Sequence, residues 1–388
     1  MFTSGLLVSV NQGDSVSVTD RLDAVLKLVE RGEFERAKQV LSGIGEGQEL
    51  SDQQQARKYA LAADIDYAIQ LREGWDVADN HRMILDHYTQ AESLGLPLDG
   101  NRLERVVSTL LALGKVGPAL ERLEVAATDI DSRISLYRRA YRIAKGRPAV
   151  RREVLTRLLE RYEDSADVAI QAWAIAELAE MRMAEESAHK VLENFLLPNM
   201  GKLVTKAHDA GLTAAEAGLL RLKVIRANAY FDMQEIARAE RAYLELQSEV
   251  DSTNPLSGQV LLGLAKIRHE QGSMVEALDL YAEAVAQFPK HDRIIEMLSG
   301  RARCEMSLGK LDKAVDTFRL ALAQAYERAD DSASVYLTQV IQGQAAWQLS
   351  QGSQKHALDL MLLLREHYRE DVPVSVLEML AQTHRRIG

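Results

Sequence analysis

Residues 261–289, LLGLAKIRHEQGSMVEALDLYAEAVAQFP, contain the sequence pattern that most limits the possible fold. Small, apolar and aromatic residues recur at helical spacing on both sides of a glycine that suits a turn. The residues that define the pattern are Leu264, Ala265, Gly272, Ala277, Tyr281, Ala284 and Pro289. The pattern predicts two helices joined by a short turn.

This spacing resembles the tetratricopeptide repeat (TPR), a family of helix-turn-helix repeats of about 34 residues. The family pattern has a turn glycine, an alanine five residues later, an aromatic residue four after that, a small residue three further on, and a terminal proline. The resemblance implies an all-α solenoid of antiparallel helical hairpins.

The alanine of the second helix serves as an anchor for finding further repeats. Seven anchors fit: Ala37, Ala119, Ala188, Ala239, Ala277, Ala314 and Ala357. Five of them have a glycine five residues earlier, all have an apolar or aromatic residue four later, and all have Ala or Val twelve earlier. The first two gaps between anchors, 82 and 69 residues, are each about twice a repeat length and predict hidden hairpins near 53–94 and 132–163.

These spacings predict about nine hairpins. The segment after Pro373 predicts a final amphipathic helix that caps the last repeat. We expect a flexible N-terminal segment over residues 1–15, an arm of degenerate TPR-like repeats over 16–199, and a TPR arm with its capping helix over 200–388. The expected break lies where the anchor spacing stretches to 51 residues, around Pro198 to Gly211.

The charge balance restricts the classes of partner. Lys and Arg number 47 against 57 Asp and Glu, a net charge of −10, which repels phosphate backbones and anionic lipids. We therefore expect neither nucleic-acid binding nor membrane insertion, since no apolar run approaches the roughly 18 to 20 residues that span a bilayer. The single cysteine, Cys304, forms no internal disulfide. We expect a soluble cytoplasmic protein; export with a cropped signal peptide is the alternative, although MFTSGLLVSV lacks a basic start.

Signatures of catalysis and metal binding are missing from the sequence. His269-Glu270 begins like a zinc-protease motif, but Ser273 stands where the second histidine would be. No nucleophile motif or phosphate loop is found. We expect no enzymatic activity, no metal and no cofactor.

A basic segment from Arg133 to Arg161 holds ten Arg and Lys against two Glu. Arg138, Arg142 and Lys145 fall at i, i+4 and i+7 of one helix. Together with Arg151 they define a basic stripe that could receive an acidic peptide or phosphate groups. The alternative is a solvated face neutralised by the next hairpin, through Glu177, Glu180, Glu185 and Glu186.

Gly263, Gly300 and Gly343 each stand fourteen residues before an anchor, inside an expected helix, where glycine costs about 1 kcal/mol relative to alanine. The TPR resemblance implies that this position faces the concave groove, so a ligand could approach the bare backbone closely. Close packing between helices is the alternative explanation. Around the glycines the repeat pattern places the other expected groove residues: Arg221, Asn228, Gln259, Lys266, His269, Arg303, Gln339 and Gln342.

The best-known ligand mode of the family is a clamp of Lys and Asn residues that grips the C-terminal carboxylate of a chaperone tail. Of the residues it needs, this sequence carries Asn228 alone, so chaperone-tail binding is disfavoured. The resemblance implies a non-catalytic scaffold or adaptor that binds a protein, peptide or helix in its concave groove. Two alternatives remain, an accessory or regulatory module of an enzyme complex and an enzyme with an unrecognised site. Co-purification of partners would separate the scaffold from the accessory module of an enzyme complex.

Overall fold

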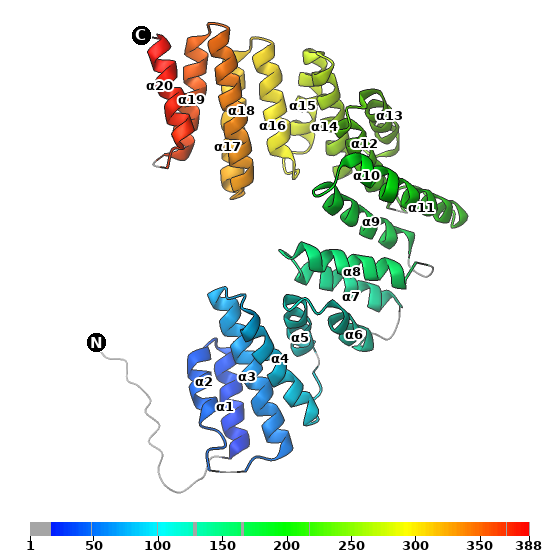
Figure 1. The fold of residues 1–388 in the computed structure, drawn as a ribbon, viewed down its shortest axis with the longest axis vertical. Coiled ribbons are helices and arrows are strands. Elements are labelled where there is room, and N and C mark those ends of the chain that lie inside the picture. The colour runs from blue at the N-terminus through cyan, green and yellow to red at the C-terminus, as the bar shows by residue number, and fades with distance from the viewer. Residues whose placement is uncertain are drawn as a thin grey trace. The chain divides into compact units, whose positions relative to one another are not determined.

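The computed structural model describes residues 17–47, 49–98, 100–126, 130–163, 167–216, 218–369 and 371–387. The described residues form twenty α-helices and one π-helical turn, η1, and contain no strand (Figure 1). The chain divides into two compact units, unit 1 (Met1–Ala166) and unit 2 (Asp167–Gly388). The expected flexible segment 1–15 lies outside the described residues.

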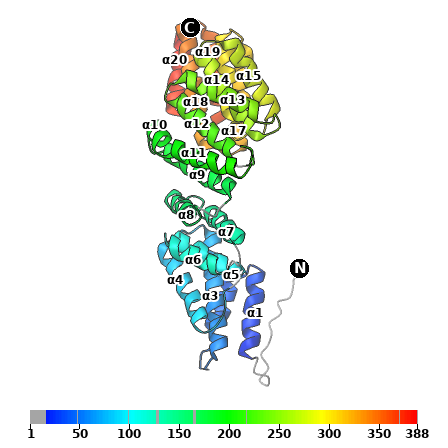
Figure 2. The same ribbon diagram turned by 90° about the vertical axis from the view of Figure 1, so that its right-hand side faces the viewer.

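Unit 1 consists of four successive helical hairpins (Figure 2). Its helices are α1 (Val18–Glu30), α2 (Phe34–Ser42), α3 (Asp52–Glu73), α4 (Ala78–Ser93), α5 (Gly100–Ala112), α6 (Val116–Ala126), α7 (Ile130–Ile143) and α8 (Pro148–Arg161). The hairpins α3–α4 and α7–α8 occupy the two stretches where the sequence predicts hidden repeats. Those two predictions are confirmed.

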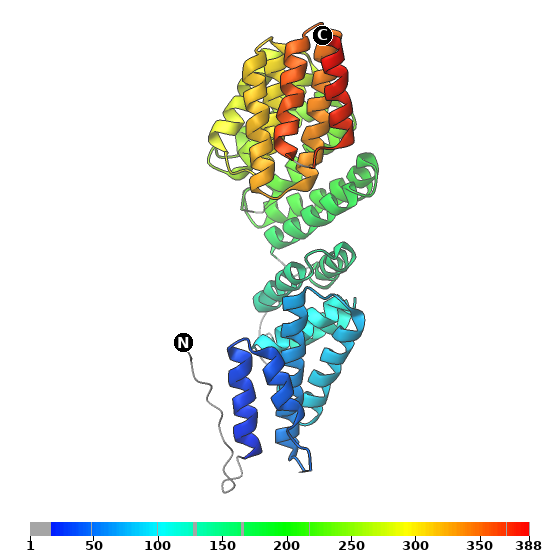
Figure 3. The same ribbon diagram turned by 90° about the vertical axis from the view of Figure 1, so that its left-hand side faces the viewer.

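Unit 2 contains five hairpins and a final helix that lies against α18 and α19 (Figure 3). Its elements are α9 (Val168–Met183), α10 (Ala188–Val191), η1 (Leu192–Leu196), α11 (Leu197–Asp209), α12 (Leu219–Asp232), α13 (Ile236–Glu249), α14 (Pro255–Glu270), α15 (Met274–Gln287), α16 (Ile294–Ser307), α17 (Leu311–Glu327), α18 (Asp331–Ser350), α19 (Gln354–Tyr368) and α20 (Val374–Ile387). The predicted architecture of nine hairpins plus a capping helix is thus confirmed over the described residues.

The core follows the repeat pattern closely. The small residues twelve positions before the anchors are completely buried in all seven matched repeats, because two helices approach each other there. These residues are Val25, Val107, Ala176, Ala227, Ala265, Ala302 and Ala345. Six of the seven anchor alanines are also completely buried. The sequence pattern therefore identifies most of the packed positions.

The turns between paired helices explain the recurring glycines. The five turn glycines all have positive φ angles, between 70° and 77°. They are Gly32, Gly114, Gly272, Gly309 and Gly352. Glycine adopts this left-handed conformation without the steric cost that a Cβ introduces. Gln234 occupies the equivalent turn in the α12–α13 hairpin with φ 61°. The turn geometry is therefore kept even where the glycine is absent.

The fifth hairpin departs from the pattern. Ala188, its expected anchor, is only half-buried and begins α10, while Val191, Leu192 and Leu196 enter the core instead. Its second arm runs through α10, η1 and α11 without a loop, and Pro198 lies in the first turn of α11. A π-helical turn is a common way to accommodate a local irregularity within a helix. The chain therefore continues through the region around residue 199 where a break is expected, and the two compact units separate at Ala166 instead.

Candidate functional site

The first helices of successive hairpins in unit 2, α9, α12, α14, α16 and α18, pack side by side and form what we call the first-helix face. Arg221 of α12 donates from Nη1 to Glu177 Oε1 and from Nη2 to Glu180 Oε2, each over 2.7 Å, and both acceptors lie on α9. Lys266 of α14 pairs with Glu296 of α16. Two of the expected groove cations are thus held by carboxylates of neighbouring repeats, which makes them poor candidates for direct ligand contacts.

Glu296 and its neighbours form a charged network on this face. Glu296 also pairs with Arg293, over 2.6 Å. Burial alone raises the pKa of Glu296, but Lys266 and Arg293 together hold that pKa below its usual value. Asp232 lies close to the same cations, yet burial raises its pKa. This network joins α12, α14 and α16, so it stabilises the stacking of repeats.

Gly263 does not line an open groove. An added Cβ would lie 2.2 Å from Cζ of Tyr243, whose ring belongs to the preceding second helix, α13. The Tyr243 hydroxyl donates a hydrogen bond to Asn228 Oδ1 over 2.6 Å, which fixes the ring in place. Asn228, another expected groove residue, is therefore occupied within the fold.

Gly300 repeats this arrangement one hairpin later. An added Cβ would lie 2.3 Å from Cζ of Tyr281, which comes from α15. For Gly263 and Gly300 the expectation of an open groove is therefore wrong, and the alternative of close helix packing holds. The glycines are needed because an aromatic ring of the preceding repeat occupies the space of their missing side chains.

Among the described residues, the other expected groove residues of the first-helix face are not held by ion pairs between neighbouring repeats. His269 is half-buried, and burial followed by the positive charge of Arg303 lowers the pKa of its imidazole. Gln259 is partly buried and Gln339 is exposed. Arg303 makes no ion pair with any part of the chain that the structure describes.

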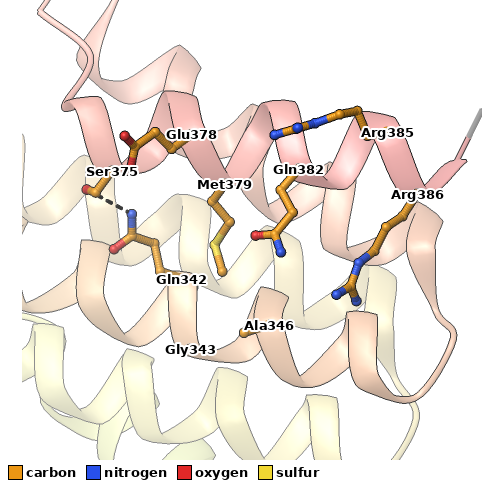
Figure 4. A pocket seen from close by; sticks show the side chains of 9 residues that line it. All are labelled: Gln342, Gly343, Ala346, Ser375, Glu378, Met379, Gln382, Arg385 and Arg386. Carbon is orange, nitrogen blue, oxygen red and sulfur yellow. Dashed lines mark hydrogen bonds between the residues drawn. The ribbon is translucent and has the colours of Figure 1, made fainter.

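Gly343, by contrast, faces open space. No atom lies within 4 Å of the position of an added Cβ, and the residue is exposed. It lies at the base of a pocket of about 880 Å³ between α18 and α20, which we call the terminal pocket (Figure 4). The pocket is lined by Gln342, Gly343, Ala346, Ser375, Glu378, Met379, Gln382, Arg385 and Arg386.

Two cations lie at one end of the terminal pocket. Arg385 and Arg386 come from the last turn of α20, and Glu378 lies toward the opposite end (Figure 4). Arg385 Nε donates to the Ala381 carbonyl over 3.4 Å, and neither arginine has a carboxylate partner within the described ranges. Gln342 Nε2 donates to Ser375 Oγ over 3.1 Å and bridges the two walls. An apolar floor of Gly343, Ala346 and Met379 thus lies beside unpaired positive charge.

The expected basic stripe does not lie on one helix: Arg138 and Arg142 are on α7, which ends at Ile143, and Lys145 lies in the turn before α8. Arg138, Arg142 and Lys145 are all exposed, and Arg142 and Lys145 have no ionic partner among the residues with described positions. Arg151 is on α8, and its side chain is held against α7: its Nε donates to the Tyr141 carbonyl over 3.2 Å and its guanidinium covers the Tyr141 ring at 4.4 Å. Because the Arg151 guanidinium is occupied by Tyr141, we keep the name basic stripe for Arg138, Arg142 and Lys145.

The carboxylates expected to neutralise the basic segment belong to unit 2. Glu177 and Glu180 are bound to Arg221 inside unit 2. The basic segment is instead partly neutralised within unit 1, where Arg147 pairs with Asp76 and Arg161 with Glu124, over 2.5 and 2.7 Å.

A buried carboxylate in unit 1 was missed by reasoning from the sequence. Asp64 of α3 is only 4% exposed, accepts a hydrogen bond from the Tyr88 hydroxyl over 2.7 Å, and pairs with Arg102 and Arg105. Burial, followed by the negative charge of Asp64, raises the pKa of Tyr88 above its usual value. All four groups are partnered, so the cluster joins α3, α4 and α5 and leaves no open ligand position. Its signal in the sequence is an aspartate within the otherwise apolar run ALAADI.

No group of three or more His, Cys, Asp or Glu side chains in the described segments is placed to hold a metal ion. Burial raises the pKa of the Cys304 thiol to about 11, so the thiol stays protonated near neutral pH and is a weak nucleophile. Of the helices that the structure describes, none combines the length and apolar character needed to cross a bilayer.

The fold and its repeated hairpins define a TPR-like helical-repeat protein. Residues 268–335 match the tetratricopeptide repeat family, which confirms the resemblance found in the sequence. No curated protein gives a significant match.

Solved structures with a similar fold include a Rap protein complexed with competence and sporulation factor, at 15% identity and a TM-score of 0.39, covering 95% of this chain and 96% of that one. A tetratricopeptide repeat protein from Parabacteroides merdae is 18% identical, with a TM-score of 0.33 and coverage of 73% and 98%. The Cut9–Hcn1 hetero-tetramer of the APC/C is 13% identical, with a TM-score of 0.35 and coverage of 95% and 83%. At these identities the likeness concerns the fold alone.

Proposed function

We propose that this protein is a non-catalytic interaction scaffold or adaptor, and that it binds a peptide or helix of a partner protein in the terminal pocket. Gly343 carries the proposal, because it is the one glycine of the three whose missing side chain leaves open space. A glycine inside an exposed helix costs about 1 kcal/mol relative to alanine. A ligand that approaches the α18 backbone closely would account for a glycine at this position.

The chemistry of the pocket favours a partner with both apolar and acidic side chains. Ala346 and Met379 provide an apolar surface next to Gly343, and methionine adapts its shape to different ligands. Arg385 and Arg386 are free to form charge-assisted hydrogen bonds with a carboxylate. An apolar anchor flanked by Asp or Glu would satisfy both parts of the pocket.

The three-residue basic stripe on α7 and the turn after it supports the same preference for acidic partners. Arg142 and Lys145 are exposed and lack ionic partners among the described side chains, so an incoming carboxylate would displace no internal ion pair. Exposed charges of this kind raise the rate of association and make it sensitive to salt.

The proposal can be tested by selecting displayed random peptides on the full chain, with measurement of the binding of selected peptides by fluorescence anisotropy. We expect selected peptides to contain Asp or Glu beside an apolar residue. Their affinity should fall at least about tenfold in Gly343→Leu, which fills the pocket, and in Arg385→Glu/Arg386→Glu, which reverses its charge.

Gly201→Leu is the matched control. Gly201 is an exposed glycine within α11 and also has no atom within 4 Å of an added Cβ. It should bind selected peptides like the wild-type protein. Peptides that bind Gly343→Leu and the wild type equally well would contradict the assignment of the terminal pocket.

A further inference from the structure

A second surface, distinct from the first-helix face, lies between the second helices α17 and α19. These helices contact each other and leave an apolar hollow of about 410 Å³. A smaller hollow of about 270 Å³ shares Arg319, Leu363 and Glu366 with it and extends it toward Asp312 and Asp359. We call the two together the α17–α19 groove.

The floor of this groove is apolar and its aromatic edge is open to solvent. Leu322 and Leu363 are almost completely buried, while Ala323 is exposed and Tyr326 is 72% exposed. His367 also lines the groove, and burial lowers the pKa of its imidazole, so the ring is neutral near pH 7. Apolar surface in a groove between two helices is suited to accept the apolar side of a further helix.

The rim of the groove is acidic. It carries four carboxylates, from Asp312, Asp316, Asp359 and Glu366, against the two guanidinium groups of Arg319 and Arg369. Asp316 is paired with Arg319 over 2.6 Å. Asp312, Asp359 and Glu366 have no hydrogen-bond or ionic partner in the described part of the chain, so their charge is available to a ligand.

We propose that the α17–α19 groove docks a basic amphipathic helix of a partner protein. The apolar side of that helix packs over Ala323 and Tyr326, and its Lys or Arg side chains face Asp359 and Glu366. The negative rim repels anionic membranes and nucleic acids, which leaves a basic protein segment as the occupant with complementary charge. This site involves different helices and the opposite charge preference from the terminal pocket, so it is independent of the function proposed above.

The test uses a labelled peptide of about fifteen residues, with Leu at helical spacings of three and four and Lys elsewhere, binding to the full chain in fluorescence anisotropy. A peptide with the same Leu positions and Glu in place of Lys is the ligand control. We expect the Leu/Lys peptide to bind, to weaken as salt rises, and to bind at least about tenfold more tightly than the Leu/Glu peptide.

The groove variant is Ala323→Arg/Asp359→Asn, and its matched control is Ala286→Arg/Asp279→Asn. Ala286 and Asp279 are exposed on α15 and stand at the same distances from anchor Ala277 as Ala323 and Asp359 stand from Ala314 and Ala357. Both variants change the net charge equally. We expect at least a tenfold loss of affinity in the groove variant and less than about twofold in the control.

Tyr326→Ala provides a second test, because this exposed ring contributes little to folding but forms the apolar edge of the groove. It should weaken binding of the Leu/Lys peptide while circular dichroism stays unchanged. Equal losses in the groove and control variants would show general attraction to an acidic chain and overturn the proposal. A wild-type dimer that the groove variant converts to a monomer would overturn it in favour of self-association.

Discussion

The phenol ring of Tyr243 fills the space where a side chain of Gly263 would project, with Cζ 2.2 Å from the position of an added Cβ. The hydroxyl of the same ring is bound to Asn228, and the ring itself is only 1% exposed. The ring therefore cannot move aside without losing both packing and a hydrogen bond. Tyr281 and Gly300 form the equivalent pair in the next hairpin.

Gly263→Ala should therefore destabilise the protein, although alanine is the better helix former. The steric conflict should cost about 1 to 3 kcal/mol, against a gain in helix propensity of up to about 1 kcal/mol. Urea unfolding measures the net loss. In a Tyr243→Ala background the same substitution should cost nothing further, so a double-mutant cycle without coupling would contradict the proposed contact.

Gly343→Leu should, in contrast, stabilise the protein. Its backbone is helical, nothing occupies the space beside it, and leucine favours a helix over glycine by roughly 0.5 to 1 kcal/mol. We expect a higher free energy of unfolding and a raised melting temperature by calorimetry. A lower melting temperature would show that the terminal pocket is closed by packing in solution.

Asp64→Ala should destabilise unit 1 by about 3 kcal/mol, because it leaves the Tyr88 hydroxyl and two arginines without their shared partner. Hydrogen exchange should accelerate in α3 to α5 and stay unchanged in α14 to α19, since distant repeats do not share contacts. The matched control is Asp79→Ala, which removes an exposed pair with Arg82 and should cost under about 0.5 kcal/mol. Faster exchange throughout unit 2 would argue against this local effect.

The stability of unit 2 should fall when the pH drops below neutral. Burial and Arg303 lower the pKa of His269 in the folded state below its ordinary value of 6.5. The stabilising contribution is therefore present above pH 6.5 and is lost as the pH falls through the lowered pKa. His269→Gln should weaken the dependence of the unfolding free energy on pH in this range. An NMR titration giving His269 a pKa of 6.5 or above would refute the prediction.

Reversal of the basic stripe, Arg142→Glu/Lys145→Glu, should weaken binding of a poly-glutamate peptide while leaving stability within about 0.5 kcal/mol, because both side chains are exposed. Binding to the wild-type protein should also decrease with added salt. Lys310→Glu/Lys313→Glu has the same spacing on exposed residues near the start of α17 and is the control. Equal losses of peptide affinity in both variants would show that the stripe is an ordinary solvated face.

Much of the fold was predictable because the relevant forces act within one hairpin. Gly272 marks a left-handed turn, and Ala265 and Ala277 mark the tight approach of the two helices that this turn connects. Even the hidden hairpins followed from spacing alone. Ala188 was misplaced because α10 begins at this residue, so Val191 takes the buried fourth position of the helix that the other anchors occupy.

The candidate site was less predictable because its residues meet across hairpins. Gly263 and Gly343 stand at the same position of their repeats, so the sequence spacing does not distinguish them. Tyr243 of the previous hairpin covers Gly263, whereas Phe318, at the equivalent position, leaves Gly343 uncovered. Asp64 pairs with Arg102 and Arg105, which stand 38 and 41 residues later in the chain, and the spacing of residues within one hairpin does not predict such a pairing.

Two ion pairs of the first-helix face, Arg221–Glu177 and Lys266–Glu296, have a consequence for how such a chain can evolve. Arg221 and Glu296 stand eighteen residues before their anchors, and their partners Glu177 and Lys266 stand eleven before theirs, so one contact occurs twice with its charges exchanged. A deletion that removed the hairpins α12–α13 and α14–α15 would bring Glu296 opposite Glu177, two negative charges. The charges of these residues therefore fit only the present order of the hairpins. Loss of these two hairpins would destabilise the protein by placing like charges next to each other at the new junction.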